Sequence, residues 1–281
     1  MTLVAHRPSQ QLVDLVRALG GSWTGYTAMC RCPAHADREP SLSLRQGDRG
    51  ILVTCFAGCN REDVLRELSR IVPGRSYSAP AGDFSPARHQ GAVERLWGTA
   101  LPVPGTLAER YLKGRRLPSD LPDTRFHPRC PHGPKPLTRF KPALLVALRE
   151  GGRLTAVQRI FLDRDSAQHT AKVMLGRPGQ GAWIGSPPAQ ALAIAEGFET
   201  AAAFGRLHGM PCWAALGARR LDQLLIPASV TTLLIAEDPD PEGRRAARRA
   251  WAQYRQPGRT LRRVPPPQGM SDWAEVLALK G

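Results

Sequence analysis

The chain has 281 residues, and 39 Lys and Arg against 24 Asp and Glu give it a formal net charge of +15. A hydrophobic fraction of 42% with 22% charged residues excludes a disordered polyelectrolyte, a collagen and a secreted disulfide scaffold. No apolar run approaches the roughly 18 residues of a membrane span, and the N-terminus lacks the pattern of a signal peptide, so we expect a cytoplasmic protein without membrane partners.

Arginine carries most of the positive charge. The chain has five Lys, and 39 − 5 leaves 34 Arg. The planar guanidinium of Arg can pair with a phosphate through two hydrogen bonds. The isoelectric point near 10.5 therefore indicates a polyanionic partner, most simply nucleic acid. A genome that favours Arg codons would give the same composition with a merely solvated surface, so composition alone leaves both interpretations open.

Residues 1–72 are expected to form a first domain. Apolar residues at helical spacing follow a Ser and predict a helix over 9–19, which Gly20-Gly21 ends. Alternating residues predict strands over 41–46 and 51–56, joined by a turn at 47–50. An amphipathic helix is predicted over 61–72. Residues 73–90 are rich in Pro, Gly and Ser and are expected to be a linker.

Residues 91–186 are expected to form a second, mixed region. A short helix is predicted around 92–98, and residues 118–142 are a Pro-rich stretch. Strands over 143–150 and 154–163, joined at Gly151-Gly152, predict a hairpin.

The pattern changes in the last part of the chain, 187–281. Short apolar strands alternate there with helices predicted over 200–209, 221–227, 242–255 and 271–279. This alternation predicts a mostly parallel sheet with helices on both faces, and an α/β fold class overall.

Four side chains have the spacing of metal ligands. Cys32-x2-His35 and Cys55-x3-Cys59 are separated by nineteen residues that contain the predicted hairpin. Two such pairs on facing turns can supply the tetrahedral ligand set of a structural Zn²⁺. Cys30 is a rival for Cys32, but the Cys-Pro-x-His turn is the better ligand pair.

The segments CPAHADREPSLSL and CFAGCNREDVLREL resemble the N-terminal zinc ribbon of bacterial and phage DNA primases. The cellular primases have two residues between the last two Cys, whereas this chain has three. The longer spacing is similar to that of primases of mobile elements.

Acidic residues follow two predicted strands in the last region. Glu196 ends one strand, and Asp238 and Asp240 end another. Strand ends of an open parallel sheet meet at one edge, where ligands bind. Carboxylates that converge there can hold Mg²⁺ or Mn²⁺, and two such ions could stabilise both oxygens of a phosphoryl transfer. Acids after strands are also common loop residues, and it is their combination in this order that indicates a site.

The segments AEGFETAAAF and LLIAEDPDPEGRRAA resemble the Toprim domain of primases, topoisomerases and some nucleases. The resemblance implies Glu196 as the catalytic acid or base and Asp238 and Asp240 as metal carboxylates. Asp272-Trp273 resembles an Asp-Trp pair that follows the last Toprim strand, and the role of Glu199 stays open.

The region between the two motifs, including PALLVAL and LTAVQRIFLD, resembles the basic region before Toprim in phage and plasmid primases. Arg159 and Lys172 match basic positions of that pattern. They are candidates to contact template phosphate or nucleoside triphosphates, with solvated surface charge as the alternative.

The resemblance implies a primase of a mobile genetic element that binds single-stranded DNA and makes short RNA primers with Mg²⁺. No G-x-x-x-x-G-K-[ST] motif is present, so a helicase would be a separate partner. A Toprim nuclease and a non-catalytic single-stranded DNA-binding accessory protein are the alternatives. A topoisomerase is disfavoured, because it would need a further domain that presents a nucleophilic Tyr.

Overall fold

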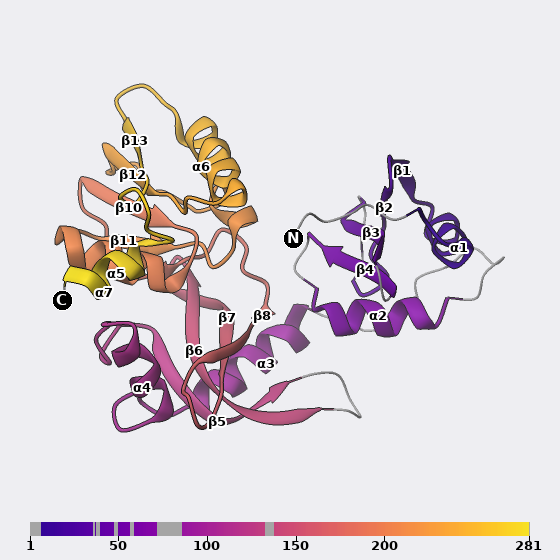
Figure 1. The fold of residues 1–281 in the computed structure, drawn as a ribbon, viewed down its shortest axis with the longest axis horizontal. Coiled ribbons are helices and arrows are strands. Elements are labelled where there is room, and N and C mark those ends of the chain that lie inside the picture. Colours follow the sequence, from indigo (N-terminus) through magenta and orange to yellow (C-terminus); the bar gives the residue numbers. More distant parts are fainter. Residues whose placement is uncertain are drawn as a thin grey trace. The chain divides into compact units, whose positions relative to one another are not determined.

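The computed structural model describes residues 7–35, 37, 40–47, 50–56, 59–71, 86–132 and 138–280. The chain forms two compact units: Met1–Arg88 with His132–Arg139, and His89–Pro131 with Phe140–Gly281. Figure 1 shows the helices and strands of both units in chain order. None of the helices in these described ranges combines the length and apolar character that crossing a bilayer requires.

The first unit is built on a four-stranded antiparallel sheet with the order β1-β2-β3-β4. The strands are β1 (Ser22–Thr24), β2 (Thr27–Cys30), β3 (Leu42–Gly47) and β4 (Gly50–Cys55), accompanied by helices α1 (Gln10–Ala18) and α2 (Arg61–Ser69). The Ser9 hydroxyl caps α1 by accepting a hydrogen bond from the Leu12 amide at 3.3 Å. The two predicted helices and the hairpin are confirmed, and β1 and β2 extend the sheet beyond the prediction.

The second unit contains an antiparallel sheet with the order β5-β6-β7-β8. Its strands are β5 (Thr124–His132), β6 (Arg139–Glu150), β7 (Arg153–Leu162) and β8 (His169–Gly176). The predicted hairpin is confirmed as β6 and β7. The edge strand β5 lies within the stretch that was expected only to be Pro-rich, because an edge strand tolerates the missing amides of Pro128 and Pro131.

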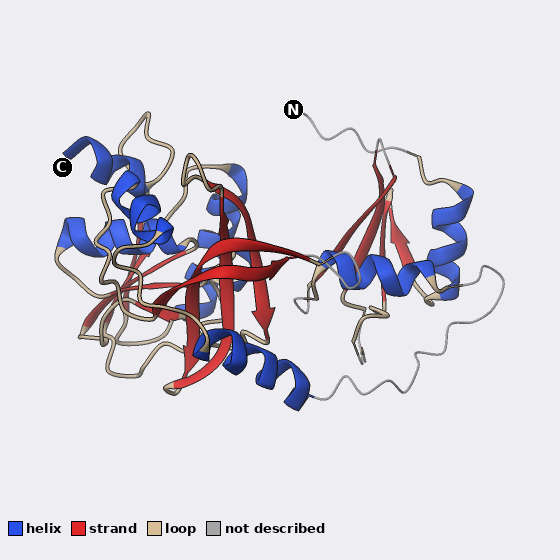
Figure 2. Ribbon diagram, turned by 90° about the horizontal axis from the view of Figure 1, so that it is seen from below, coloured by secondary structure: helices blue, strands red, loops and turns tan. Residues whose placement is uncertain are grey.

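Helix α3 (Pro86–Gly98) begins before the predicted helix and includes the last residues of the segment expected to be a linker. The rest of that segment lies outside the described residues. Val93 and Leu96 of α3 pack against one face of the β5–β8 sheet, in a buried cluster with Leu145 and Phe161. Helices lie against the strands of this unit in both views (Figures 1 and 2).

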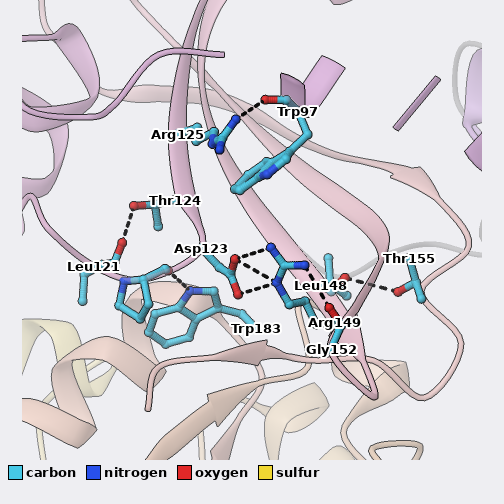
Figure 3. Close-up of polar contacts among 11 residues, drawn as sticks. Trp97, Leu121, Asp123, Thr124, Arg125, Leu148, Arg149, Gly152, Thr155 and Trp183 are labelled. Carbon is cyan, nitrogen blue, oxygen red and sulfur yellow. Dashed lines mark hydrogen bonds and ion pairs between the residues drawn. The ribbon is translucent and has the colours of Figure 1, made fainter. Parts of the chain in front are cut away.

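An ion pair joins the segment before β5 to the β6–β7 hairpin. Nε and Nη2 of Arg149 donate to the Asp123 carboxylate at 2.8–2.9 Å, and Arg149 Nη1 donates to the Gly152 carbonyl at 3.0 Å. Nearby, the Trp183 indole donates to the Pro122 carbonyl at 2.8 Å. Figure 3 shows Arg149 between Asp123 and Gly152, with Trp183 near Asp123. The Asp123–Arg149 pair and the Trp183 hydrogen bond hold the segment 122–123 to the hairpin and to Trp183.

The last part of the chain forms a five-stranded sheet with the order β13-β12-β10-β11-β9. The strands are β9 (Trp183–Ile184), β10 (Ala191–Ala195), β11 (Cys212–Ala214), β12 (Thr232–Ala236) and β13 (Thr260–Val264). All pairs are parallel except β9 with β11, so the mostly parallel sheet is confirmed.

Helices cover both faces of this sheet, as predicted. Helices α5 (Phe198–His208) and α7 (Trp273–Lys280) contribute to one buried cluster, and α6 (Pro241–Tyr254) contributes to another. Along β10, Ala193 and Ala195 belong to the first cluster while Leu192 and Ile194 belong to the second. Figure 1 shows α6 on the other side of these strands from α5 and α7.

The prediction of a helix over residues 221–227 is wrong. A short 3-10 turn (Ala218–Arg220) is followed by turns and irregular backbone. The Tyr254 hydroxyl accepts a hydrogen bond from the Leu224 amide at 2.7 Å and donates hydrogen bonds to the carbonyls of Leu221 and Leu224. A side chain from α6 thereby satisfies backbone groups that a helix would have paired internally.

One continuous core joins the two sheets of the second unit. It holds Leu144, Leu148 and Ile160 of the β5–β8 sheet together with Phe198 and Trp273 of the β9–β13 sheet and its helices. Helix α4 (Leu107–Gly114) adds Tyr111 and Leu112 to it. The predicted mixed α/β class is confirmed.

Candidate functional site

The four predicted zinc ligands lie together in the first unit. The ligand atoms of Cys32, His35, Cys55 and Cys59 all lie within 4.8 Å of one another. Cys55 ends β4 and Cys59 precedes α2, so the hairpin brings the second pair back to the first. His35 Nδ1 lies 3.1 Å from Cys59 Sγ and 3.8 Å from Cys55 Sγ. This donor set fits a structural zinc site.

Asp37 lies beside the ring nitrogen of His35 that faces away from the sulfur atoms. Its Oδ2 accepts hydrogen bonds from the Cys32 amide at 2.7 Å and from the Ser41 hydroxyl at 2.5 Å, and its Oδ1 lies 3.4 Å from His35 Nε2. Burial works against the charged form of this carboxyl, yet the hydrogen bonds from Ser41 and Cys32 keep its pKa below the usual value. A carboxylate at Nε2 leaves Nδ1 to face the sulfur atoms, which is the arrangement that orients a metal-ligating imidazole.

The structure also separates Cys30 from Cys32. Cys30 is fully buried in the core of the first unit, where burial raises the pKa of its thiol to about 12. Its sulfur is not among the ligand atoms that gather in the Cys/His group. The alternation of β2 places Cys30 in that core, and Cys32 follows the strand and joins the cluster.

The predicted acids lie at the carboxyl ends of two adjacent strands. Ala195 of β10 pairs with Ala236 of β12, so the two strands end at the same level of the sheet. Glu196 directly follows β10 and Asp238 follows β12 by two residues. Asp240 caps α6, and its Oδ1 accepts a hydrogen bond from the Gly243 amide at 2.6 Å.

Asp238 is a partly buried acid of this edge, close to other carboxylates. Burial, followed by the charges of Asp272 and Asp240, raises its pKa to about 6, while the Thr200 hydroxyl donates to its Oδ1 at 3.4 Å. Asp272 therefore belongs to the same acidic edge, although it lies beyond β13, just before α7. Proximity of three carboxylates is unfavourable unless a cation or a proton balances them.

The acids are less tightly gathered than the Cys/His cluster. Within the described ranges, the Cys/His group is the one whose three or more ligand atoms lie within 4.8 Å of one another. Glu196, Asp238 and Asp240 share an edge without reaching that proximity.

Gly243 allows the backbone after β12 to approach α6. A Cβ at this position would lie 2.4 Å from the Asp238 carbonyl oxygen and 2.8 Å from the Asp238 Cβ. The absence of a side chain at Gly243 thus lets Asp238 pack directly against the first turn of the helix.

Glu199, whose role the sequence left open, is a buried carboxylate beside this edge. It is 4% exposed and accepts hydrogen bonds from Lys172 Nζ at 2.8 Å and from the Tyr111 hydroxyl. Tyr111 comes from α4 and Lys172 from β8, so Glu199 connects the region before the Toprim-like segment to α5. The charge of Lys172 also acts on Asp238, lowering its pKa against the larger contrary effects of burial and acidic neighbours.

The two predicted nucleic-acid or nucleotide contacts have different environments. Lys172 keeps a third of its side chain exposed while it pairs with Glu199. Arg159 is only 7% exposed, and its Nη1 donates to the Pro131 carbonyl at 2.8 Å. Sequence alone could not distinguish them, because the burial of Arg159 depends on β5, which the Pro-rich stretch concealed.

Two family descriptions match the second unit. Residues 191–281 match the Toprim domain, and residues 87–185 match a domain of unknown function, DUF7146. No curated protein matches the chain.

Solved primase structures share the fold at low sequence identity. The DnaG catalytic core is 20% identical with a TM-score of 0.51, covering 70% of this chain and 76% of that chain. A DNA primase domain from Pseudomonas aeruginosa is 18% identical with a TM-score of 0.50, covering 69% and 75%. The zinc-binding and RNA polymerase domains of the Aquifex aeolicus primase are 16% identical with a TM-score of 0.50, covering 97% and 83%. The chain thus carries a Toprim domain over residues 191–281 and resembles DnaG-type DNA primases in its fold.

Proposed function

We propose that this chain is a DNA primase that binds single-stranded DNA and joins nucleoside triphosphates into short RNA primers. The observation that carries the proposal is the acidic edge of a Toprim domain, where Glu196 and Asp238 end adjacent parallel strands beside Lys172. The primase-like fold around that edge supports the same reaction class.

The acidic edge would hold Mg²⁺ or Mn²⁺ through Glu196, Asp238 and Asp240, and we add Asp272 because its charge acts on Asp238. Hard carboxylate oxygens are the ligands that these ions prefer. When bound, the ion supplies Lewis-acid stabilisation of the phosphate oxygens.

In the proposed reaction the 3′-hydroxyl oxygen bonds to the α-phosphorus of the incoming nucleotide, and the bond from that phosphorus to the β-phosphate oxygen breaks to release pyrophosphate. Glu196 is our candidate to accept the proton of the hydroxyl. Lys172, whose ammonium is held beside the edge by Glu199 and whose side chain is one-third exposed, would pair with the triphosphate. Arg159 is 7% exposed and bonded to the Pro131 carbonyl, so it would contact template or nucleotide only after a local rearrangement of β5.

The first region would hold the template. We propose Zn²⁺ as the ion of Cys32, His35, Cys55 and Cys59, because zinc takes Cys sulfur and His nitrogen as ligands. Four protein ligands would leave no position for substrate, so the site would be structural. We propose the division into a zinc-ribbon region 1–72, a linker 73–90, a basic region 91–186 and a Toprim region 187–281. The three residues between Cys55 and Cys59 favour a primase of a mobile element. We propose a separate helicase as its partner.

The test is incubation of the purified chain with single-stranded DNA, Mg²⁺ and labelled ribonucleotides. Labelled oligomers that disappear in Asp238→Asn would support the proposal. Shortened DNA would instead identify a Toprim nuclease, and retention of DNA without turnover would identify a binding protein. Either of these results, with all four ribonucleotides present, would overturn the primase assignment.

A further inference from the structure

Helix α6 presents an arginine-rich face that the proposed chemistry does not use. Its buried side consists of Gly243, Ala246, Ala247, Ala250 and Tyr254. Its exposed side carries the basic residues Arg244, Arg245, Arg248 and Arg249, with Arg255 at its C-terminal end. Glu242 is the acidic residue within the helix.

This charge pattern is unfavourable for the helix itself. Arg244 and Arg248, and likewise Arg245 and Arg249, are like charges four residues apart, which destabilises a helix. Helix α2 shows the contrast within the same chain, because its Arg66 pairs with Asp63 at 2.7 Å.

Three of the arginines have no ion pair or hydrogen bond from their side chains to any other described residue: Arg245, Arg248 and Arg255. Arg249 pairs with Asp222 at 3.5 Å, and Arg244 donates to the Pro239 carbonyl. The face therefore has a surplus of guanidinium groups directed to solvent.

An aromatic ring interrupts the arginines at helical spacing. Trp251 is 36% exposed and lies three residues after Arg248 and four residues before Arg255. Positions 244, 248, 251 and 255 form a single stripe roughly 16 Å long. Arginine and an exposed aromatic ring on one stripe are the elements that hold single-stranded nucleic acid, because the guanidinium pairs with phosphate and the ring stacks on a base.

We propose that this α6 face, defined by Arg244, Arg245, Arg248, Trp251 and Arg255, binds a single strand of nucleic acid. Asp240 of the acidic edge caps the N-terminus of α6, so a strand on this face would lead away from that edge. The inference deepens the proposed function, since a primase reads a single-stranded template, but its test measures binding alone and requires no turnover.

The test compares full-length variants in equilibrium binding of a labelled single strand at several salt concentrations, without nucleotides or divalent ions. Each lost phosphate contact lowers the slope of log K against log salt by about 0.7 on a single strand. We expect R245A/R248A to lower it by about 1.4. Trp251→Ala should weaken binding by roughly 5- to 150-fold with an unchanged slope, and Trp251→Phe should retain most of the affinity.

Arg206→Ala is the matched control, because Arg206 is an exposed arginine on α5 outside this face. It should bind as the parent does. If R245A/R248A behaves like Arg206→Ala, the α6 face does not contact nucleic acid and the proposal fails, whatever the priming assay shows. If Trp251→Ala binds normally, or a duplex of the same sequence binds as tightly as the single strand, the assignment to a single strand is wrong. Unchanged melting temperatures of the variants establish that binding, and not folding, has been altered.

Discussion

The hydrogen bonds at Glu199 make a quantitative prediction about the second unit. Tyr111→Phe deletes one hydroxyl and leaves the ring, so the core around α4 keeps its shape. The lost bond ends on a carboxylate that is 4% exposed and that water reaches poorly. A hydrogen bond to a charged group contributes about 1.5–3 kcal/mol.

The predicted change in melting temperature follows from that energy. For a unit of this size, each kcal/mol shifts the melting temperature by about 2–4 °C. Tyr111→Phe should therefore lower the transition of the second unit by roughly 3–12 °C. Lys172→Met should cost less than the roughly 3–5 kcal/mol of a fully buried pair, because a third of the Lys172 side chain is exposed.

The pH dependence has a definite sign. Burial opposes the charged form of Glu199, but Lys172 and Tyr111 outweigh it and hold the pKa of this carboxyl below its usual value. The stabilisation is therefore complete above the unfolded pKa of about 4.3 and is lost as pH falls through the folded pKa. Glu199→Gln should reduce this dependence, and Tyr111→Phe should cost less in that background, about 0.5–1.5 kcal/mol, since the bond then ends on a neutral amide.

The assay is thermal unfolding followed by circular dichroism at pH 7 and at steps down to pH 3.5. Tyr26→Phe is the control. Because Tyr26 is 52% exposed, this variant should have the melting temperature of the parent protein. If Tyr111→Phe also melts as the parent does, or if its effect is the same in the parent and in the Glu199→Gln background, the hydroxyl does not bond to an ionised Glu199 and the reasoning is refuted.

Four further predictions concern the candidate metal sites and the helix beside them. Cys55→Ser should abolish stoichiometric zinc, measured by metal analysis, and Asp37→Ala should weaken zinc binding about 10- to 100-fold in chelator competition; an unchanged affinity would show that Asp37 does not support His35. Asp238→Asn should reduce priming by roughly 10²–10³-fold without lowering the melting temperature, because its charge is unfavourable in the folded state; normal priming at saturating Mg²⁺ would remove Asp238 from the site. Gly243→Ala should cost about 1–3 kcal/mol of stability by thermal unfolding, since its Cβ would lie 2.4 Å from a backbone oxygen; a parental melting temperature would contradict that contact.

Features set within one element or one turn could be predicted from the sequence. Ser9 and the apolar spacing after it specify α1, and the alternation of 41–46 and 51–56 specifies the hairpin that returns Cys55 to Cys32. Alternating strands and helices specify the parallel sheet, and therefore the shared edge of Glu196 and Asp238. Periodicity and caps act over a few neighbouring residues, so the chain records them directly.

Features that depend on distant partners were decided by the tertiary structure. Residues 221–227 look helical by themselves, but Tyr254, thirty residues or more away, binds their backbone groups. Glu199 meets Tyr111 from 88 residues away and Lys172 from 27. A carboxylate in a sequence can be a solvated loop residue or a buried anchor, and only the arrangement that removes it from water and supplies two donors decides between them.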